Sequence, residues 1–168
     1  MADARIVHDI LGSEDTFWKL FFDKEYNEAL FLRALGFDSW KIVSQDEGAD
    51  RIERVVDVVP KIGELPGPLK KLVENGVGYR ERGTFLRAEH RMKMTVEPTV
   101  MHDKLSISGV LYTERTGDRS CRRVYDAVVN AKVFGIGGMI EGRILQDIKQ
   151  SYDKAAEFTN TWIREKGL

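Results

Sequence analysis

Five residues have side chains that could act as acids, bases or hydrogen-bonding groups within one strand-rich region: Arg54, Glu81, His90, Arg123 and Tyr125. Side chains two residues apart along a strand point to the same face of a sheet. By this alternation each of the five falls in the more apolar set of its strand, which is expected to face inward. Buried charges are kept only when they are paired, because taking an ion out of water costs several kcal/mol. We therefore expect a small polar cluster in an apolar cavity.

Arg54 and Glu81 lie on strands that are predicted to be neighbours, and they could pair diagonally. A remaining hydrogen-bond donor would then hold the hydroxyl or carboxylate of a ligand. An acid–base pair could also be assembled from His90, Glu81 and Tyr125, although many cavities allow such a pair. The alternative is a strand register displaced by one residue, which would place these charges at the rim of the sheet in water.

The motifs of metal, nucleotide and nucleophilic chemistry are missing. His8, His90 and His102 are far apart and have no metal-ligand spacing with Cys121. The glycine cluster at 135–138 lacks the Lys-Ser/Thr of a phosphate-binding loop, and we interpret it as a joint between a strand and a helix. No nucleophile elbow is present. The sequence therefore predicts no metal and no cofactor, and nothing in it demands catalysis.

The composition is that of an ordinary globular protein. The 168 residues are enough for a single domain over 1–168 with its own core. Hydrophobic residues make up 42% and charged residues 32%. A net charge of −1, with acids and bases intermixed, does not indicate nucleic-acid binding. The start of the chain lacks the apolar core of a signal peptide, and no apolar run reaches membrane-spanning length, so we expect a cytoplasmic protein.

The longest regular pattern covers residues 137–168. Apolar side chains recur there every three or four positions, as on one face of a helix. They are Ile140, Ile144, Ile148, Tyr152, Ala155 and Ile163. The opposite face, which includes Glu141, is expected to be solvated. At 1.5 Å per residue the helix would be roughly 40 Å long, so it needs a broad partner surface to cover its apolar stripe.

The rest of the chain is predicted to supply that surface. A strand over 5–11 precedes two short helices, of which the first is capped by Ser13 and the second stops at Gly36. The period then changes to two, and strands are predicted at 39–45, 51–59, 79–87, 90–98, 104–114 and 120–134. The fold class is therefore α+β, with a curved antiparallel seven-stranded sheet wrapped around a long C-terminal helix and two short helices between strands 1 and 2. Concave space between sheet and helix favours a small apolar ligand.

The predicted ligand-binding side chains face this concave space from the first helix, the strands and the long helix. They are Phe17, Phe21, Arg54, Val56, Tyr79, Glu81, Phe85, His90, Met92, Met94, Leu111, Tyr125, Ile140, Ile144 and Ile148. The aromatic residues of the first helix could equally be plain core, and Met92 and Met94 suit any core as well as a cavity wall. The apolar segment 62–73 could be a lid, a lip that touches a membrane, or a cap folded back on the end of the sheet.

A resemblance to a known superfamily runs through nearly the whole chain. Residues 10–23, ILGSEDTFWKLFFD, resemble the first strand-to-helix passage of START-like domains, which are also called Bet v 1-like, helix-grip or SRPBCC domains. Residues 51–60, RIERVVDVVP, with LPGPL at 65–69 and GYRER at 78–82, are similar to the VASt branch and to uncharacterised bacterial relatives of it. The long helix, with its Gly-Gly entry and QSYD at 150–153, matches as well. This pattern specifies the fold better than the ligand.

The resemblance implies a hydrophobic cavity between the sheet and the long helix, and a ligand such as a sterol, a fatty acyl chain, a phospholipid or another polycyclic molecule. Eukaryotic VASt domains are associated with sterol transfer between membranes. We therefore expect a lipid-binding or transfer module that touches a membrane surface transiently through residues 62–72. The second hypothesis is an enzyme of the polyketide cyclase or hydratase type, with His90 or Glu81 as acid or base on a hydrophobic polycyclic substrate. A protein-interaction module with an exposed apolar patch is the third.

Overall fold

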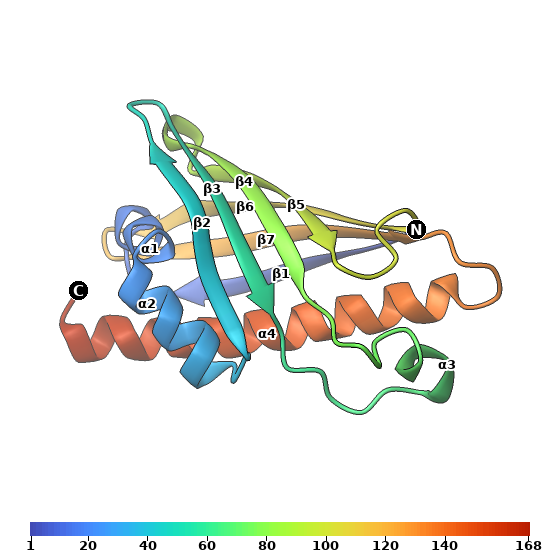
Figure 1. The fold of residues 1–168 in the computed structure, drawn as a ribbon. Coiled ribbons are helices and arrows are strands. Elements are labelled where there is room, and N and C mark those ends of the chain that lie inside the picture. The colour runs from blue at the N-terminus through green and yellow to red at the C-terminus, as the bar shows by residue number, and fades with distance from the viewer.

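The computed structural model describes residues 1–168, and a single curved sheet is its central feature (Figure 1). All seven strands pair antiparallel, in the order β1-β7-β6-β5-β4-β3-β2. The strands are β1 Ala2–Ile10, β2 Ser39–Glu47, β3 Arg51–Val59, β4 Tyr79–Leu86, β5 Arg91–Pro98, β6 Leu105–Gly117 and β7 Ser120–Ala131. The predicted α+β class and the seven-stranded sheet are confirmed.

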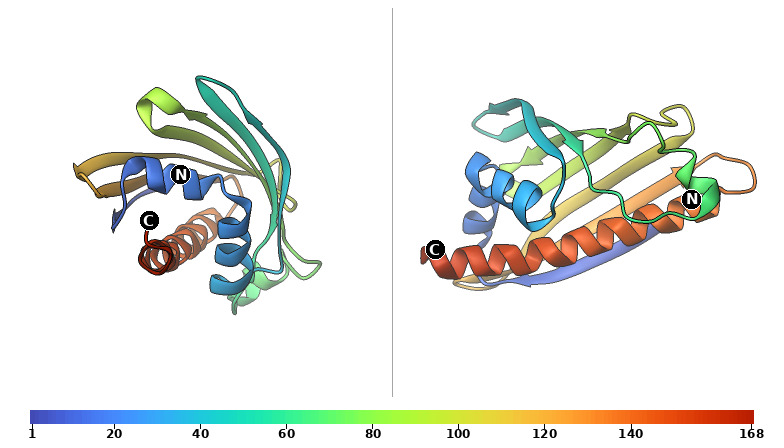
Figure 2. Two further views of the ribbon diagram at one scale, coloured as in Figure 1. Left: turned by 90° about the vertical axis from the view of Figure 1, so that its left-hand side faces the viewer. Right: turned by 60° about the horizontal axis from the view of Figure 1, so that its bottom comes forward.

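The long C-terminal helix and the helical segments between the first two strands lie on the concave side of this sheet, and two short helical turns lie in connections between later strands. The helical elements are α1 Glu14–Phe21, α2 Lys24–Glu28, the π-helical turn η1 Ala29–Ala34, α3 Gly67–Lys70, the 3-10 turn η2 Arg87–Glu89 and α4 Gly137–Lys166. Figure 2 shows the sheet curving over α4, with α1, α2 and η1 inside the curve. The Ser13 hydroxyl accepts a hydrogen bond from the Thr16 backbone N–H, which confirms the predicted helix cap. None of the helices is long and apolar enough to cross a membrane.

Helix α4 covers its apolar stripe against the sheet, as its spacing predicts. Ile140, Ala155 and Ile163 are buried, and the helix contacts mainly β1 and β7. The solvated face is predicted wrongly at one position, because Glu141 is buried and accepts a hydrogen bond of 2.9 Å from the backbone N–H of Ala131. Strand β7 ends at that residue, earlier than the predicted 134, and the carboxylate satisfies its last donor.

Two glycines inside strands make room for large inward side chains. A Cβ atom at Gly83 would overlap the side chain of Met92, and one at Gly109 would overlap the ring of Tyr125. The absence of side chains at these positions lets Met92 fill the sheet surface and lets the Tyr125 ring lie against the backbone of β6. The contents of the concave side are therefore set partly by glycines on neighbouring strands.

The buried side chains form three clusters, and the two larger ones lie towards opposite ends of α4. The larger cluster joins α1 to the sheet, where the rings of Trp18 and Phe85 lie 4.2 Å apart and Trp18 Nε1 donates to Thr113 Oγ1 at 2.9 Å. The smaller one, at the other end, includes Leu69 and Ile140. Residues of both clusters line a cavity that lies between them.

Candidate functional site

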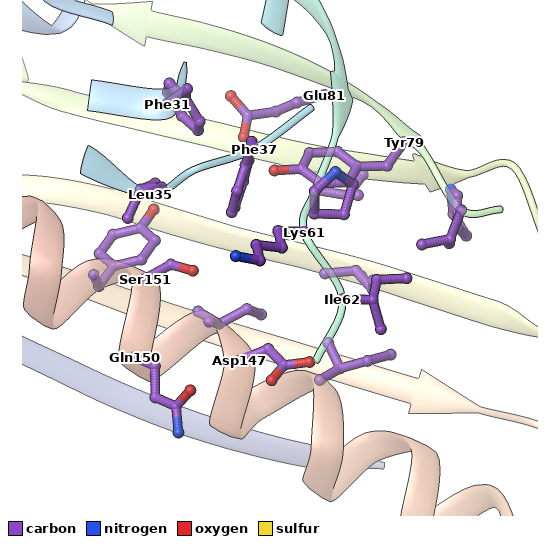
Figure 3. A pocket seen from close by; sticks show the side chains of 18 of the residues that line it. Phe31, Leu35, Phe37, Lys61, Ile62, Tyr79, Glu81, Asp147, Gln150 and Ser151 are labelled. Atoms are coloured by element: carbon purple, nitrogen blue, oxygen red, sulfur yellow. The ribbon is translucent and has the colours of Figure 1, made fainter. Parts of the chain in front are cut away.

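The cavity between the concave face of the sheet and α4 has a volume of about 580 Å³ (Figure 3). Hydrophobic residues account for 27 of the 41 that line it, so most of its wall offers no hydrogen bond to a ligand. Ligand sites of this kind combine an apolar wall with a few polar groups that fix orientation. The polar groups of this cavity come from α2, β3, the segment between β3 and β4, β4, β7 and α4.

Most of the predicted site residues line this cavity. They are Phe17, Phe21, Arg54, Tyr79, Glu81, Met94, Leu111, Tyr125, Ile140, Ile144 and Ile148. The register of β3 against β4 places Arg54 opposite Gly83 and Glu81 opposite Val56, so the predicted inward sets are the real ones. The alternative of a register displaced by one residue is therefore excluded.

Val56, Phe85 and Met92 face inward but do not line the cavity. Val56 packs with Trp40, Phe85 packs against the ring of Trp18, and Met92 fills the space that Gly83 leaves. Each is covered by another side chain. A side chain that points inward from a strand therefore does not always reach the cavity surface. The prediction that these three side chains line the ligand site is corrected.

His90 is also outside the cavity, and its predicted role as an acid or base there is wrong. Strand β5 begins one residue later than predicted, and His90 lies in the preceding turn with a left-handed backbone, φ 47°. Its Nδ1 lies 3.3 Å from Glu14 Oε2 and its Nε2 lies 3.4 Å from Asp15 Oδ1, on the far side of α1 from the cavity wall. His90 and Glu81 therefore cannot work on one ligand.

Arg54 and Glu81 form the diagonal pair that the sequence predicts. Arg54 Nη2 lies 3.5 Å from Glu81 Oε1. The Arg54 side chain is only 4% exposed. Its Nη1 donates a hydrogen bond to the Phe21 carbonyl oxygen at 2.7 Å, and its guanidinium lies 4.4 Å from the centre of the Phe21 ring. Arg54 is thus held by α1 and serves mainly as the counter-ion of Glu81.

The Glu81 carboxylate is the more available member of the pair. Its side chain is 21% exposed, and beyond the contact with Arg54 it has no partner within the chain. Burial raises the pKa of Glu81, and the positive charge of Arg54 partly offsets this. In Figure 3 Glu81 projects from β4 into the space beside Phe31 and Phe37. It is therefore the less solvent-exposed of the two acidic side chains, Glu81 and Asp147, that line the cavity.

Three phenol rings lie close to this carboxylate. Tyr125 and Tyr152 stack with ring centres 4.5 Å apart and an angle of 3° between planes, and Tyr79 shares the inward face of β4 with Glu81. Burial raises the pKa of all three phenols, and the negative charge of Glu81 raises each of them further. Their hydroxyls consequently stay protonated at neutral pH and can donate hydrogen bonds.

Arg123, the second buried cation, lines the cavity, but it is already bonded to groups of the chain itself. Its Nη2 donates to the Tyr152 carbonyl oxygen at 2.8 Å and to His8 Nδ1 at 2.9 Å. Since arginine can only donate, His8 Nδ1 accepts, and the protonated Nε2 of His8 donates to Asp153 Oδ1 at 2.7 Å. Burial lowers the pKa of His8, an effect that the bond to Asp153 partly offsets. This network ties β1 and β7 to α4.

The segment between β3 and β4 borders the open side of the cavity, where Lys61, Ile62 and Leu65 line it (Figure 3). Arg143 of α4 holds this segment, with Nη1 donating to the Glu64 carbonyl oxygen at 2.7 Å. Farther along, Leu69 of α3 is buried against Leu105 and Ile140. The segment therefore caps the end of the sheet with its second half and borders the mouth with its first.

Sequence reasoning missed several lining residues. They are Tyr26, Leu30, Phe31, Leu35, Phe37, Lys61, Asp147, Gln150 and Ser151. Part of this set follows η1, where the Leu35 N–H bonds to the Leu30 carbonyl, a spacing of five residues that a search at helical period does not follow. Tyr152 also lines the cavity, and its place in the three-to-four spacing of the long helix could have identified it. No group of three or more His, Cys, Asp or Glu residues is placed to hold a metal ion.

Comparison with known proteins identifies a family and the fold. Residues 5–163 match a family described as "Protein of unknown function (DUF2505)". No curated protein matches the chain. The chain is similar to the crystal structure of a protein from Thermus thermophilus, with a TM-score of 0.71, 13% identity, and coverage of 99% of this chain and 100% of that one.

Two enzymes have the same fold. The Zhui aromatase/cyclase from Streptomyces sp. R1128 gives a TM-score of 0.70 at 10% identity, over 99% of this chain and 96% of that one. Norcoclaurine synthase from Thalictrum flavum, in complex with dopamine and hydroxybenzaldehyde, gives 0.62 at 17% identity, over 98% and 88%. At these identities the likeness shows the fold alone, which is of the helix-grip, SRPBCC type. The nearer placement beside VASt domains is not confirmed.

Proposed function

The chain belongs to the DUF2505 family of proteins of unknown function, and we propose that it binds a hydrophobic small molecule, such as a sterol or another lipid, between the sheet and α4. The observation that carries this proposal is the cavity of about 580 Å³ with its mainly hydrophobic lining. That volume lies within the range of about 300 to 1,000 Å³ that small-molecule sites occupy. Apolar surface buried there contributes about 25 cal/mol per Å².

Titration with an uncharged fluorescent probe, N-phenyl-1-naphthylamine, tests the proposal. Ser151 lines the cavity from α4, so a Ser151→Trp variant fills part of the space. Gln146→Trp puts the same ring on the exposed side of the same helix and is the matched control. We expect the wild type and Gln146→Trp to bind the probe and Ser151→Trp to lose most of the affinity. Equal binding by all three proteins would place the probe elsewhere and contradict the proposal.

We also propose that one end of the molecule touches a membrane surface during ligand exchange. Phe134, between β7 and α4, is fully exposed, and Ile62 and Met139 are exposed as well. The smaller core cluster joins the segment 62–72 to this end. Sedimentation with vesicles of phosphatidylcholine and phosphatidylserine checks this, with Phe134→Ser expected to weaken binding. Val43→Ser removes an exposed apolar side chain from β2 and is expected to have no effect; equal effects would contradict the proposal.

The second candidate function is proton transfer on a hydrophobic carbonyl compound. The observation that favours it is the Glu81 carboxylate, which faces an apolar cavity with a raised pKa. Exchange of the α-hydrogens of 2-tetralone for deuterium in D₂O, followed by NMR, is the test. Glu81→Gln should abolish any exchange above the solvent rate, whereas Glu97→Gln on the outer face of β5 should not. Exchange at the solvent rate with the wild type counts against this function.

A further inference from the structure

We infer that the cavity selects an apolar ligand that carries a hydrogen-bond donor, a hydroxyl or a protonated amine, over a ligand that carries a carboxylate. This inference rests on the proposed function, and it names the chemical class of the ligand. It follows because some charged groups are available to a ligand in the cavity, whereas others are already bonded within the protein.

The cavity presents an acceptor. Glu81 contacts only Arg54, and the second oxygen of its carboxylate has no partner within the chain. Tyr79, on the same face of β4, also has no hydrogen-bond partner for its hydroxyl within the chain. A ligand hydroxyl placed between them can donate to Glu81 and accept from Tyr79. A ligand carboxylate would instead meet the negative charge of Glu81 at close range, where the low dielectric strengthens repulsion.

The two buried cations do not compensate for this charge. Arg54 and Arg123 are each only 4% exposed. Their bonded donors go to the Phe21 carbonyl, to the Tyr152 carbonyl and to His8. Both side chains line the cavity, and the Nε atom of each is buried without a partner in the chain. These Nε atoms are fully enclosed, and the bonded Nη atoms could bind a ligand carboxylate only by giving up a buried partner. This differs from the sequence-based expectation, in which a donor left over beside Arg54 could hold either a hydroxyl or a carboxylate.

Lys61 is the cation that competes with this inference. It lines the cavity from the segment between β3 and β4, and Asp147 of α4 lines it as well (Figure 3). The Lys61 side chain is exposed, so water screens its charge. An anionic ligand bound through Lys61 would lie at the mouth and not beside Glu81, and its affinity would depend on Lys61.

Isothermal titration with a matched series of naphthalenes at neutral pH is the test. The series is naphthalene, 2-naphthol, 2-naphthylmethylammonium and 2-naphthoate. We expect the wild type to bind 2-naphthol, the ammonium compound or both roughly 10- to 100-fold more tightly than 2-naphthoate, as is typical of a hydrogen bond to a charged group. The two donors distinguish a hydroxyl from an amine ligand. Glu81→Gln should remove most of this preference, and Glu97→Gln, an exposed glutamate on β5, should keep it.

Several results would overturn the inference. One is tighter binding of 2-naphthoate than of both donors by the wild type, especially if Lys61→Met abolishes it. Another is a donor preference that survives Glu81→Gln. If Glu81→Gln does not fold, the wild-type series decides alone. Uptake of naphthalene without any donor preference contradicts this inference only, whereas failure of the whole series and of N-phenyl-1-naphthylamine to bind contradicts the proposed function itself.

Discussion

Arg54 Nη2 lies 3.5 Å from Glu81 Oε1, diagonally across β3 and β4. Because Arg54 also donates to the carbonyl oxygen of Phe21, this pair connects the last residue of α1 to the cavity wall. The arginine is enclosed by aromatic rings and the glutamate faces the open space. One contact therefore links the stability of the fold to the polar character of the ligand site.

Arg54→Met should lower the free energy of unfolding by about 3 kcal/mol, because it leaves a half-buried carboxylate without a counter-ion and the Phe21 carbonyl without its donor. Urea denaturation measures this. The control is Arg82→Met, since Arg82 pairs with Glu97 on the exposed outer face and such pairs contribute under about 1 kcal/mol. Equal losses in the two variants would show that the Arg54 pair is no stronger than a surface pair.

The network of His8, Arg123 and Asp153 should make stability depend on pH. The folded-state pKa of His8 lies below its ordinary 6.5 because of burial, which outweighs the bond to Asp153, while Arg123 and Lys149 also lower it. As the pH falls below 6.5, the unfolded chain binds a proton that the folded protein resists, so acidification favours unfolding. His8→Gln should flatten the loss of stability between about pH 7 and pH 5.

Urea midpoints at several pH values test this dependence on His8. His102→Gln is the control, because His102 lies in an exposed turn beside Asp103. Glu81 acts in the opposite direction: its raised folded-state pKa means that its contribution to stability increases as the pH falls towards 4.5. The difference between the wild type and His8→Gln isolates the histidine, and parallel curves for these two proteins would contradict the prediction.

Gly109→Ala should damage both the fold and the cavity. Its Cβ would overlap the Tyr125 ring, which must then shift off Tyr152, and overpacking of this kind costs about 1–3 kcal/mol. We expect weaker binding of N-phenyl-1-naphthylamine as well. Gly138→Ala at the start of α4 meets no atom within 4 Å and should leave both properties unchanged or slightly raise stability. Normal probe binding by Gly109→Ala would show that the stacked tyrosines do not shape the site.

Arg143→Ala should speed ligand exchange. Its bond to the Glu64 carbonyl holds the segment beside the cavity mouth, and losing a hydrogen bond from a charged group corresponds to roughly a tenfold change in the opening equilibrium. Stopped-flow release of N-phenyl-1-naphthylamine measures the rate. Arg164→Ala, near the exposed end of the same helix, is the control. Unchanged release from Arg143→Ala would mean that ligands leave by another route.

The face of the strand or helix on which most side chains lie could be predicted from the sequence. The reason is that the two-residue period of a strand and the three-to-four-residue period of a helix are strict. Alternation along β3 and β4 placed Arg54 and Glu81 on one face and on adjacent strands. The three-to-four spacing of 137–166 identified the face of α4 that meets the sheet. Both patterns arise from local backbone geometry and from the burial of apolar side chains away from water. They can therefore be recognised in a single sequence.

The depth at which an inward side chain is buried and the geometry of the turns could not be predicted from these periods. Whether an inward residue such as Phe85 reaches the cavity depends on which ring covers it, and Trp18 lies 67 positions earlier in the chain. His90 lies outside β5 because it has a left-handed backbone in the turn that precedes this strand. The π-helical turn η1 displaced the lining residues that follow it. These features result from tertiary contacts, which sequence periodicity does not encode.

Mass spectrometry of the protein purified without detergent is the most direct test of the central claim. Spectra recorded under native and then denaturing conditions would reveal a molecule held in the cavity. The account predicts that the wild type releases an apolar compound bearing a hydroxyl or amine, near one per chain, and that Ser151→Trp releases none. A wild type that carries no such molecule, and that after extraction takes up neither 2-naphthol nor N-phenyl-1-naphthylamine, would contradict it.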